Sequence, residues 1–394
     1  MRNDPSHTAV PERKITKQIA DEFIICYFLF CNVACVYPKI ICPIIIMNMR
    51  QEDVVPAIKF DPEVCVRCET VDCLMKCQYI EFTCTSDAKA EKLKINAGEN
   101  SRVLNECLTC YACQEYCPYN NNPFYLLVEL QEEKEILPAP KPIVEEQLRM
   151  MSPKGRITQQ KVRSPVVNMC AFPMLTGCVR GKLFEGASVI SGNDIFCNIM
   201  WLHFAKNSAI RERVPKMIDN IMSFYLTDSK IDEMVCFHDE CYGTYTSVAE
   251  AFGISVPFKP VHLFDYINRR LDELSDYIKP INEKIAYQRP CSNRLSPETD
   301  KMLDEIFIKI GAQRVPRKHD RENALCCGGV PRALQRDELA DELVEKNIRD
   351  MLSTGAKYCV FNCPFCMATL GQEVAEHGLM PVLVSDLVLI ALGE

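Results

Sequence analysis

Cysteine is the residue type through which this chain could do chemistry, since 24 of its 394 residues are cysteines. Most of them fall in tight groups such as "CVRCETVDCLMKC" (65–77) and "CLTCYACQEYCP" (107–118). A chain of this length with no convincing secretion signal is not a small disulfide scaffold. Closely spaced thiols instead suit metal ligation in a reducing compartment, and this is the chemistry that the sequence predicts.

The two runs near the amino end have different internal gaps. In residues 65–77 the gaps are two, four and three residues, whereas in residues 107–118 they are two, two and three, followed by Pro118. The second pattern is typical of bacterial ferredoxins, in which three close thiolates hold one [4Fe–4S] cube and the fourth reaches the other cube. Residues 55 to 125 therefore resemble ferredoxin-like modules with paired cubanes.

That resemblance implies two ligand sets. One cluster would be held by Cys65, Cys68, Cys73 and Cys117, and the other by Cys77, Cys107, Cys110 and Cys113. The first run departs from the family pattern in its gap of four and in Gln78, which stands where proline is usual. Four thiolates also suit zinc, so a pair of zinc sites is the alternative. Cys84 has no partner at useful spacing and is expected to be a buried thiol.

The last 230 residues or so contain an internal repeat. Residues 235–254 align without gaps on residues 360–379 at an offset of 125, which places Cys241 on Cys366 and His238 on Cys363. In both copies a short β-like run leads into the cysteines and a helical pattern follows, as in an α/β layer. The sequence thus predicts two related α/β halves.

The second half has a further cysteine pattern. Cys291 is followed by the adjacent pair in "CCGG" (326–329) and then by "CPFC" (363–366). This spacing resembles the cysteine-rich CCG domain of the heterodisulfide reductase family over residues 286–370. Joined to a two-cubane module, the chain resembles the fused heterodisulfide reductase subunit, in which the family's small ferredoxin-like subunit and its CCG subunit form one chain. The resemblance implies a noncubane or [4Fe–4S] cluster on five ligands: Cys291, Cys326, Cys327, Cys363 and Cys366.

Elementary chemistry agrees with such a site. Two thiols that are separated by two residues chelate one metal atom, whereas thiolates of adjacent residues point apart and suit two different irons of one cluster. Glycines directly after the pair allow positive φ and a close approach of backbone N–H groups to sulfur. For Cys291 the alternative is an apolar buried thiol, since "RPCSN" lacks the histidine often found there in the family. Cys359 is expected to be a core residue.

The first half keeps fewer of these ligands. Trp201 and Leu202 occupy the positions of the adjacent pair at the 125-residue offset, although Cys197 lies four residues away. The remaining candidates are Cys170, Cys197, His238 and Cys241, with Cys178 as a substitute. Such a mixed set suits a third cubane, a zinc ion or no metal. His203 and His262 are expected to be ordinary histidines rather than ligands.

The elements that must position these ligands suggest an α+β multidomain fold. A helical ferredoxin-like module with two [4Fe–4S] clusters is followed by a duplicated α/β CCG-domain pair. In residues 122–137, apolar residues recur at helical spacing and acidic residues lie on the other face, which predicts an amphipathic helix. The expected division is an atypical extension (1–50), the two-cluster module (51–137), a linker or docking segment (138–165), a degenerate CCG half (166–285) and an intact CCG half (286–394).

The extension contains an apolar stretch, residues 23–47, that Asn32, Pro38 and Lys39 interrupt. Its unbroken apolar run is too short for a membrane span, which needs about 20 residues. It does not match a signal peptide either. We expect it to be an upstream extension, with the working protein beginning near Met47 or Met49.

The remaining features narrow the function. A net charge of −8 argues against nucleic-acid binding, and we find no dinucleotide, P-loop or hydrolase motif, so no nicotinamide is expected to bind directly. The resemblance implies an electron-transfer subunit of an anaerobic oxidoreductase complex, cytoplasmic or peripheral to a membrane. Its partners would be a flavoprotein or ferredoxin-type donor and a catalytic, membrane cytochrome or quinone-linked subunit. Alternatives are a heterodisulfide reductase-type enzyme, an electron-transfer component for benzoyl-coenzyme A reduction, and a zinc-bound structural protein.

Overall fold

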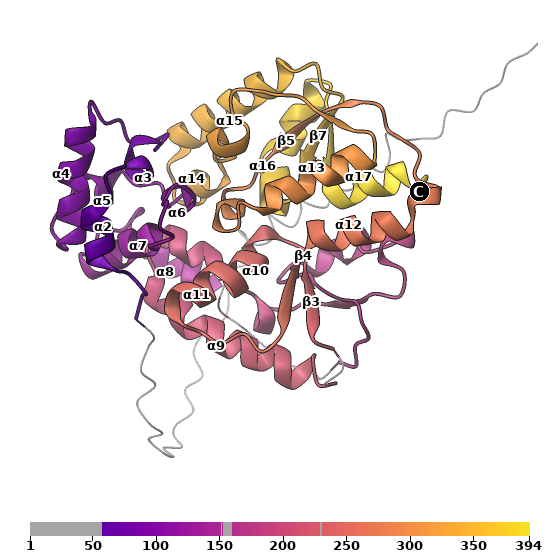
Figure 1. Ribbon diagram of the computed structural model, residues 1–394, viewed down its shortest axis with the longest axis horizontal. Helices are drawn as coiled ribbons and strands as arrows, with labels where there is room; N and C mark the ends of the chain where they lie inside the picture. The colour runs from indigo at the N-terminus through magenta and orange to yellow at the C-terminus, as the bar shows by residue number, and fades with distance from the viewer. Residues whose placement is uncertain (1–56, 151, 153–159, 229–230) are drawn as a thin grey trace, which may run out of the picture.

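The computed structural model describes residues 57–394 except 151, 153–159 and 229–230 (Figure 1). The predicted extension, with its start near Met47 or Met49, lies outside the described residues. Among the described residues, no helix is both long and apolar enough to cross a membrane.

Residues 57–150 form a group of helices at one end of the molecule, drawn from indigo to purple in Figure 1. The helices are α2 (Pro62–Arg67), α3 (Asp72–Met75), α4 (Thr85–Asn96), α5 (Arg102–Glu106), α6 (Ala112–Glu115), α7 (Pro123–Glu133) and α8 (Lys141–Met150). The helix predicted over 122–137 is confirmed as α7, which begins at a proline, a residue preorganised for the first helical turn. Helix α8 lies in the segment that was predicted as a linker, and its Val144 is buried.

The first α/β half is built on a parallel sheet in the order β2-β1-β3-β4. Its strands are β1 (Val166–Asn168), β2 (Ser188–Ile190), β3 (Glu233–Cys236) and β4 (Lys259–His262). The longer helices are α9 (Asn207–Phe224) and α12 (Leu263–Glu273), and after β3 the chain continues through α10 (Asp239–Gly243), the π-helical turn η5 (Thr244–Val248) and α11 (Ala249–Phe252). The 3₁₀ segments are η1 (Pro173–Cys178), η2 (Lys182–Phe184), η3 (Asn193–Ile195), η4 (Ile199–Phe204) and η6 (Ser275–Tyr277).

The second half has a parallel sheet in the equivalent order β6-β5-β7-β8. Its strands are β5 (Lys284–Gln288), β6 (Gln313–Arg314), β7 (Tyr358–Phe361) and β8 (Met380–Leu383). Its helices are α13 (Thr299–Lys309), α14 (Gly329–Ala333), α15 (Asp337–Leu352), α16 (Pro364–Glu376) and α17 (Val384–Ala391), with 3₁₀ segments η7 (Cys291–Leu295) and η8 (Arg321–Asn323). The predicted strand–loop–helix order is confirmed at β3 and β7; duplication as its origin stays a prediction.

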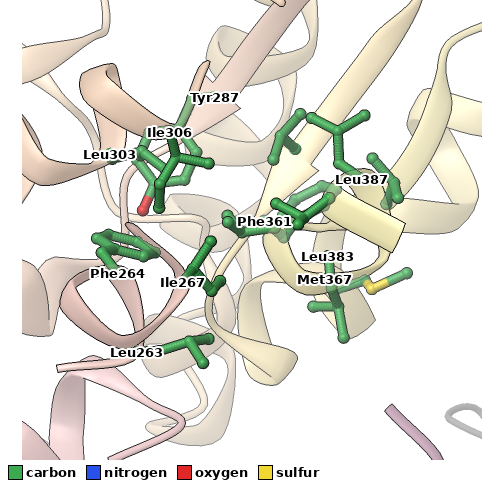
Figure 2. Packing of buried hydrophobic residues seen from close by; sticks show 14 of the residues in the cluster. Leu263, Phe264, Ile267, Tyr287, Leu303, Ile306, Phe361, Met367, Leu383 and Leu387 are labelled. Carbon is green, nitrogen blue, oxygen red and sulfur yellow. The ribbon is translucent and has the colours of Figure 1, made fainter. Parts of the chain in front are cut away.

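The two halves share an apolar core. Leu263, Phe264 and Ile267 of α12 belong to the same buried cluster as Leu303 and Ile306 of α13. Figure 2 shows these side chains beside Phe361, Leu383 and Leu387, which come from β7, β8 and α17. Burying such side chains against each other is the main source of stability in a domain, so this shared core holds the two halves together.

Candidate metal centres

One predicted ligand set, the distal set, lines a cavity in the helical module. The distal set consists of Cys65, Cys68, Cys73 and Cys117. Burial, together with the nearby negative charge of Cys117, raises the pKa of the Cys73 thiol to about 12. The backbone N–H of Asn121 donates to Cys117 Sγ at 3.3 Å, which is the kind of contact that stabilises a metal-bound thiolate. Cys117 thus converges on one space with three cysteines of the earlier run.

The other predicted set, the proximal set, lines a second cavity. The proximal set consists of Cys77, Cys107, Cys110 and Cys113. Burial, together with the negative charge of Cys110, raises the pKa of Cys107 to about 12, and the N–H of Thr109 donates to Cys107 Sγ at 3.3 Å. Cys73 lines both cavities, so the two sets share a wall. The positive φ of Thr109 and Tyr111 turns the chain tightly enough for three cysteines of one short run to face this cavity.

The five-cysteine set gathers in the second half and consists of Cys291, Cys326, Cys327, Cys363 and Cys366. Cys291 begins η7, and Cys363 is the N-cap of α16, whose first residue is Pro364. Because proline starts the helix at this point, Cys366 lies in its first turn, close to Cys363. Four of the five are nearly enclosed, with exposed fractions of 3% to 8%, and Cys291 is half-buried.

Cys327 is the centre of this set. The thiols of Cys326 and Cys366 donate hydrogen bonds to its sulfur, which holds the pKa of Cys327 well below its ordinary value despite burial. In contrast, burial raises the pKa of Cys291, and the negative charge of Cys327 raises it further. Cys327 is therefore the thiol of this set that most readily loses its proton, and metal binding would have to displace protons from the others.

The glycines after the adjacent pair are required by geometry. Gly328 has φ of +95°, and a Cβ there would lie 2.8 Å from the carbonyl oxygen of Ala340. A Cβ at Gly329 would lie 2.6 Å from the ring of Phe365. The Gly328 N–H faces Cys326 Sγ at 3.5 Å. Only glycine lets the backbone turn this closely around the sulfurs.

The first half contains a smaller site, the three-cysteine site, made of Cys170, Cys197 and Cys241. Their sulfurs lie within 4.8 Å of one another, and all three residues are buried. The Cys170 thiol donates to Cys197 Sγ at 3.7 Å, and hydrogen bonds from Cys170 and Cys241 hold the pKa of Cys197 well below its usual value. Cys197 thus lies with Cys170 and Cys241, two of the other candidate ligands of this half.

His238, the fourth predicted ligand, lies outside that 4.8 Å group. Its ring packs edge-on against Phe172 and Phe237, with centroids 4.9 and 5.3 Å away. Burial lowers the pKa of His238 to about 4, and its Nε2 atom has no hydrogen-bond partner. A buried neutral imidazole with an unsatisfied nitrogen fits a ligand role, although this role stays a prediction.

Other cysteines and histidines have ordinary environments. The prediction that Cys84 is buried is wrong: it is exposed at the N-cap of α4, where its sulfur lies 3.0 Å from Ser86 Oγ. Cys359 lies in the core, as predicted, against Met351 Sδ at 3.4 Å. His203 Nδ1 lies 3.1 Å from Thr109 Oγ1, and His262 Nε2 lies 3.2 Å from Asp239 Oδ1. Cys178 is buried in the core cluster shared by the halves, whereas the three-cysteine site lies in another cluster.

Sequence reasoning missed the residues that join these sites. The carboxylate of Glu240, directly before Cys241, accepts a hydrogen bond from Cys363 Sγ at 3.4 Å, so it reaches from the first half to the five-cysteine set. Burial, with the negative charge of Asp239, raises the pKa of Glu240 to about 7. The Cys326 N–H donates to Tyr79 Oη at 2.9 Å. Both contacts join residues that are distant in sequence, and no local motif predicts them.

Comparison with known proteins bears on this second half. Residues 285–371 match the cysteine-rich domain family, CCG. The match includes all members of the five-cysteine set, and together with the many cysteines it indicates iron–sulfur redox function. The likeness to the fused heterodisulfide reductase subunit stays a prediction. A crystal structure of a hypothetical protein from Helicobacter pylori is similar at 12% identity with a TM-score of 0.46, over 72% of this chain and 60% of that one. This chain thus matches less than two thirds of that protein.

The donor chemistry of all four sites fits metal rather than disulfide. Every cysteine in the described part of the chain is a free thiol. Sulfur is the preferred donor for iron–sulfur clusters and zinc, and in the distal and proximal sets four sulfurs face one cavity. Burial raises the pKa of most of these thiols, so the positive charge of bound metal is what would stabilise them as thiolates.

Proposed function

We propose that this chain is an iron–sulfur electron-transfer subunit with [4Fe–4S] clusters at the distal and proximal sets and a further iron–sulfur cluster at the five-cysteine set. Such clusters supply one-electron transfer when bound. The protein's contribution is to hold the sites in a row, to exclude water from them and to dock other redox proteins. In this proposal, its partners are a flavoprotein or ferredoxin-type donor and a separate catalytic or membrane subunit.

The observation that carries this proposal is the direct packing of α6 on η7. Helix α6 follows Cys110 and includes Cys113, both of the proximal set, while η7 begins at Cys291 of the five-cysteine set. Burial is the main cause of the raised pKa of Cys291, and the negative charge of Cys110 contributes to it. The two thiols are therefore close enough to interact electrostatically. Together with the wall that Cys73 provides between the first two cavities, this supports a continuous order: distal set, proximal set, five-cysteine set.

Burial favours a relay over thiol chemistry at the five-cysteine set. A disulfide substrate must bring a sulfur atom into contact with the reacting site, but four of these cysteines are almost completely enclosed. Electron transfer does not need such contact. The three-cysteine site, in contrast, is compact enough for a single ion, and in this proposal it holds a structural zinc with His238 as the fourth ligand.

The test is anaerobic purification followed by iron, sulfide and zinc analysis and EPR spectroscopy. The proposal expects more than about eight irons per chain, since two cubanes account for about eight, and one zinc. An EPR signal that changes when a heterodisulfide or thiol is added would favour the enzymatic alternative. A redox-active protein that does not respond to thiols supports the relay. Zinc at the distal and proximal sets, with no sulfide, would overturn the proposal.

A further inference from the structure

A buried charge cluster lies where the helical module meets the second half. Glu115, on α6, accepts hydrogen bonds from Arg289 Nη1 at 3.0 Å and from Arg294 Nη1 at 2.6 Å. The side-chain exposed fractions are 13% for Glu115, 2% for Arg289 and 4% for Arg294. Both arginines flank Cys291, and Glu115 lies between Cys113 and Cys117. The cluster therefore ties the ligand loop of one site to that of the next.

The charges of this cluster do not balance. Two guanidinium groups share one carboxylate, and among the described residues their other hydrogen-bond partners are neutral. For Arg294 these are Tyr116 Oη at 3.2 Å and the carbonyl oxygens of Glu322 and Ala324 at 2.9 and 2.8 Å. A buried unpaired charge is costly, so a second negative charge is expected close by.

The proximal set is positioned to provide this second negative charge. Arg294 Nη1 donates to Glu115 at 2.6 Å, and Glu115 ends α6, the helix that follows Cys110 and includes Cys113. Because α6 packs on η7, the Arg294 guanidinium lies beside the ligand loop of the proximal set. A cluster on four thiolates carries net negative charge, and reduction adds one more electron to it. In a site screened from water, a fixed positive charge stabilises the reduced, more negative state more than the oxidised state.

We propose that Arg294 is a positioning residue that supplies the countercharge for a cluster held by the proximal set and thereby raises its reduction potential. This inference rests on the proposed function and deepens it. Because Arg294 belongs to the second half, docking of that half sets the potential of the preceding site. Electron flow along the chain then depends on the contact between α6 and η7.

The experiment is an EPR-monitored redox titration of the full reconstituted chain with dithionite as the reductant. The signal of the proximal cluster is the one that Cys107→Ser removes. Arg294→Gln removes the positive charge and should lower the midpoint potential, whereas Glu115→Gln removes the opposing negative charge and should raise it. Arg294→Lys keeps the charge and should remain closer to the wild-type value than Arg294→Gln, and it also serves where Arg294→Gln does not fold.

The sign of the two shifts separates electrostatics from structural damage. Disturbed packing alone would move the potential in the same direction in both variants, or not at all, and either result overturns the inference. Arg349→Gln, on the exposed face of α15, changes the net charge equally and should leave the potential unchanged. Failure of the proposed function is recognised separately, because the wild-type chain would then contain no iron that Cys107→Ser removes.

Discussion

The two α/β halves use their central cysteines alike. Cys197 in the first half and Cys327 in the second each accept hydrogen bonds from two other thiols, and each has a lowered pKa. Each is followed by a residue in the left-handed region, Asn198 at φ 56° and Gly328 at φ +95°. Asparagine tolerates this region better than most residues. The sharp turn after the central cysteine is thus present in both halves.

What surrounds that turn differs. The first half has the apolar η4, with Trp201 and Leu202, at the positions where the repeat would place the adjacent pair. This segment packs on the helical module: Tyr111 Oη donates to the carbonyl of Ile199 at 3.5 Å, and His203 lies against Thr109. The second half contains the five-cysteine set and contacts the module through the ion pairs of Glu115 and through the Cys326 N–H, which donates to Tyr79 Oη. The half with fewer candidate ligands thus also serves as a packing surface for the helical module.

The largest expected difference between the halves is in metal content. Cys327→Ser should remove the iron of the five-cysteine set and leave the distal and proximal irons, because it deletes the central sulfur. Cys197→Ser should leave the iron unchanged and remove zinc. Elemental analysis of anaerobically purified protein measures both. Equal loss of iron in the two variants would show that the sites are alike and would contradict the assignment.

Asp239 links the two halves, and its substitution should have the next largest effect. Its buried carboxylate accepts hydrogen bonds from His262 Nε2 at 3.2 Å, from Asn293 Nδ2 at 2.7 Å and from Asn362 Nδ2 at 2.6 Å. Asp239→Ala leaves three buried donors unsatisfied and should lower the free energy of unfolding by about 3–5 kcal/mol. Urea denaturation measures this change, with the exposed Asp341→Ala as the control. A change below about 1 kcal/mol would show that the halves do not depend on this link.

Gly328→Ala tests the turn in the second half. The substitution places a Cβ against the Ala340 carbonyl in a backbone conformation that alanine disfavours, and it should cost about 3 kcal/mol. Gly177→Ala is the matched control in the first half, since a Cβ there would meet nothing within 4 Å. Thermal or urea unfolding compares the two variants. Equal tolerance would mean that the turn relaxes and does not need glycine.

His203 gives a smaller, pH-dependent effect in the first half. Burial lowers its pKa to about 4, below the ordinary value of 6.5, so the unfolded chain binds more protons between these values. Stability contributed by neutral His203 is complete above pH 6.5 and decreases as the pH falls toward 4. His203→Asn should therefore reduce the loss of stability between pH 7 and pH 5 by about 2 kcal/mol. Urea unfolding at both values tests this, with the exposed His377→Asn as control; an unchanged pH dependence would contradict it.

Local patterns in the sequence were sufficient for several features. The helix α7 followed from apolar spacing, and the strands β3 and β7 followed from short β-like runs before the cysteines. The convergence of Cys117 on Cys65 and of Cys77 on Cys107 followed from a resemblance rather than from spacing. The helix α8 was missed because its neighbourhood is polar and rich in proline and the helix has a single buried residue, Val144. Cys84 was misplaced because a thiol without metal partners is not necessarily buried.

The sequence alone determined which thiols can act together in short runs, because ligand spacing within one loop is a covalent property of the chain. It also determined the alternation of strand and helix, since apolar periodicity is local. Only the tertiary structure decided how the sites adjoin. The contacts of Glu115 with Arg289 and Arg294 join residues 174 and 179 positions apart, and the bond from Tyr79 to Cys326 spans 247. Only folding brings such distant residues together. For the ion pairs, the folded interior also decides which charges are buried beside one another.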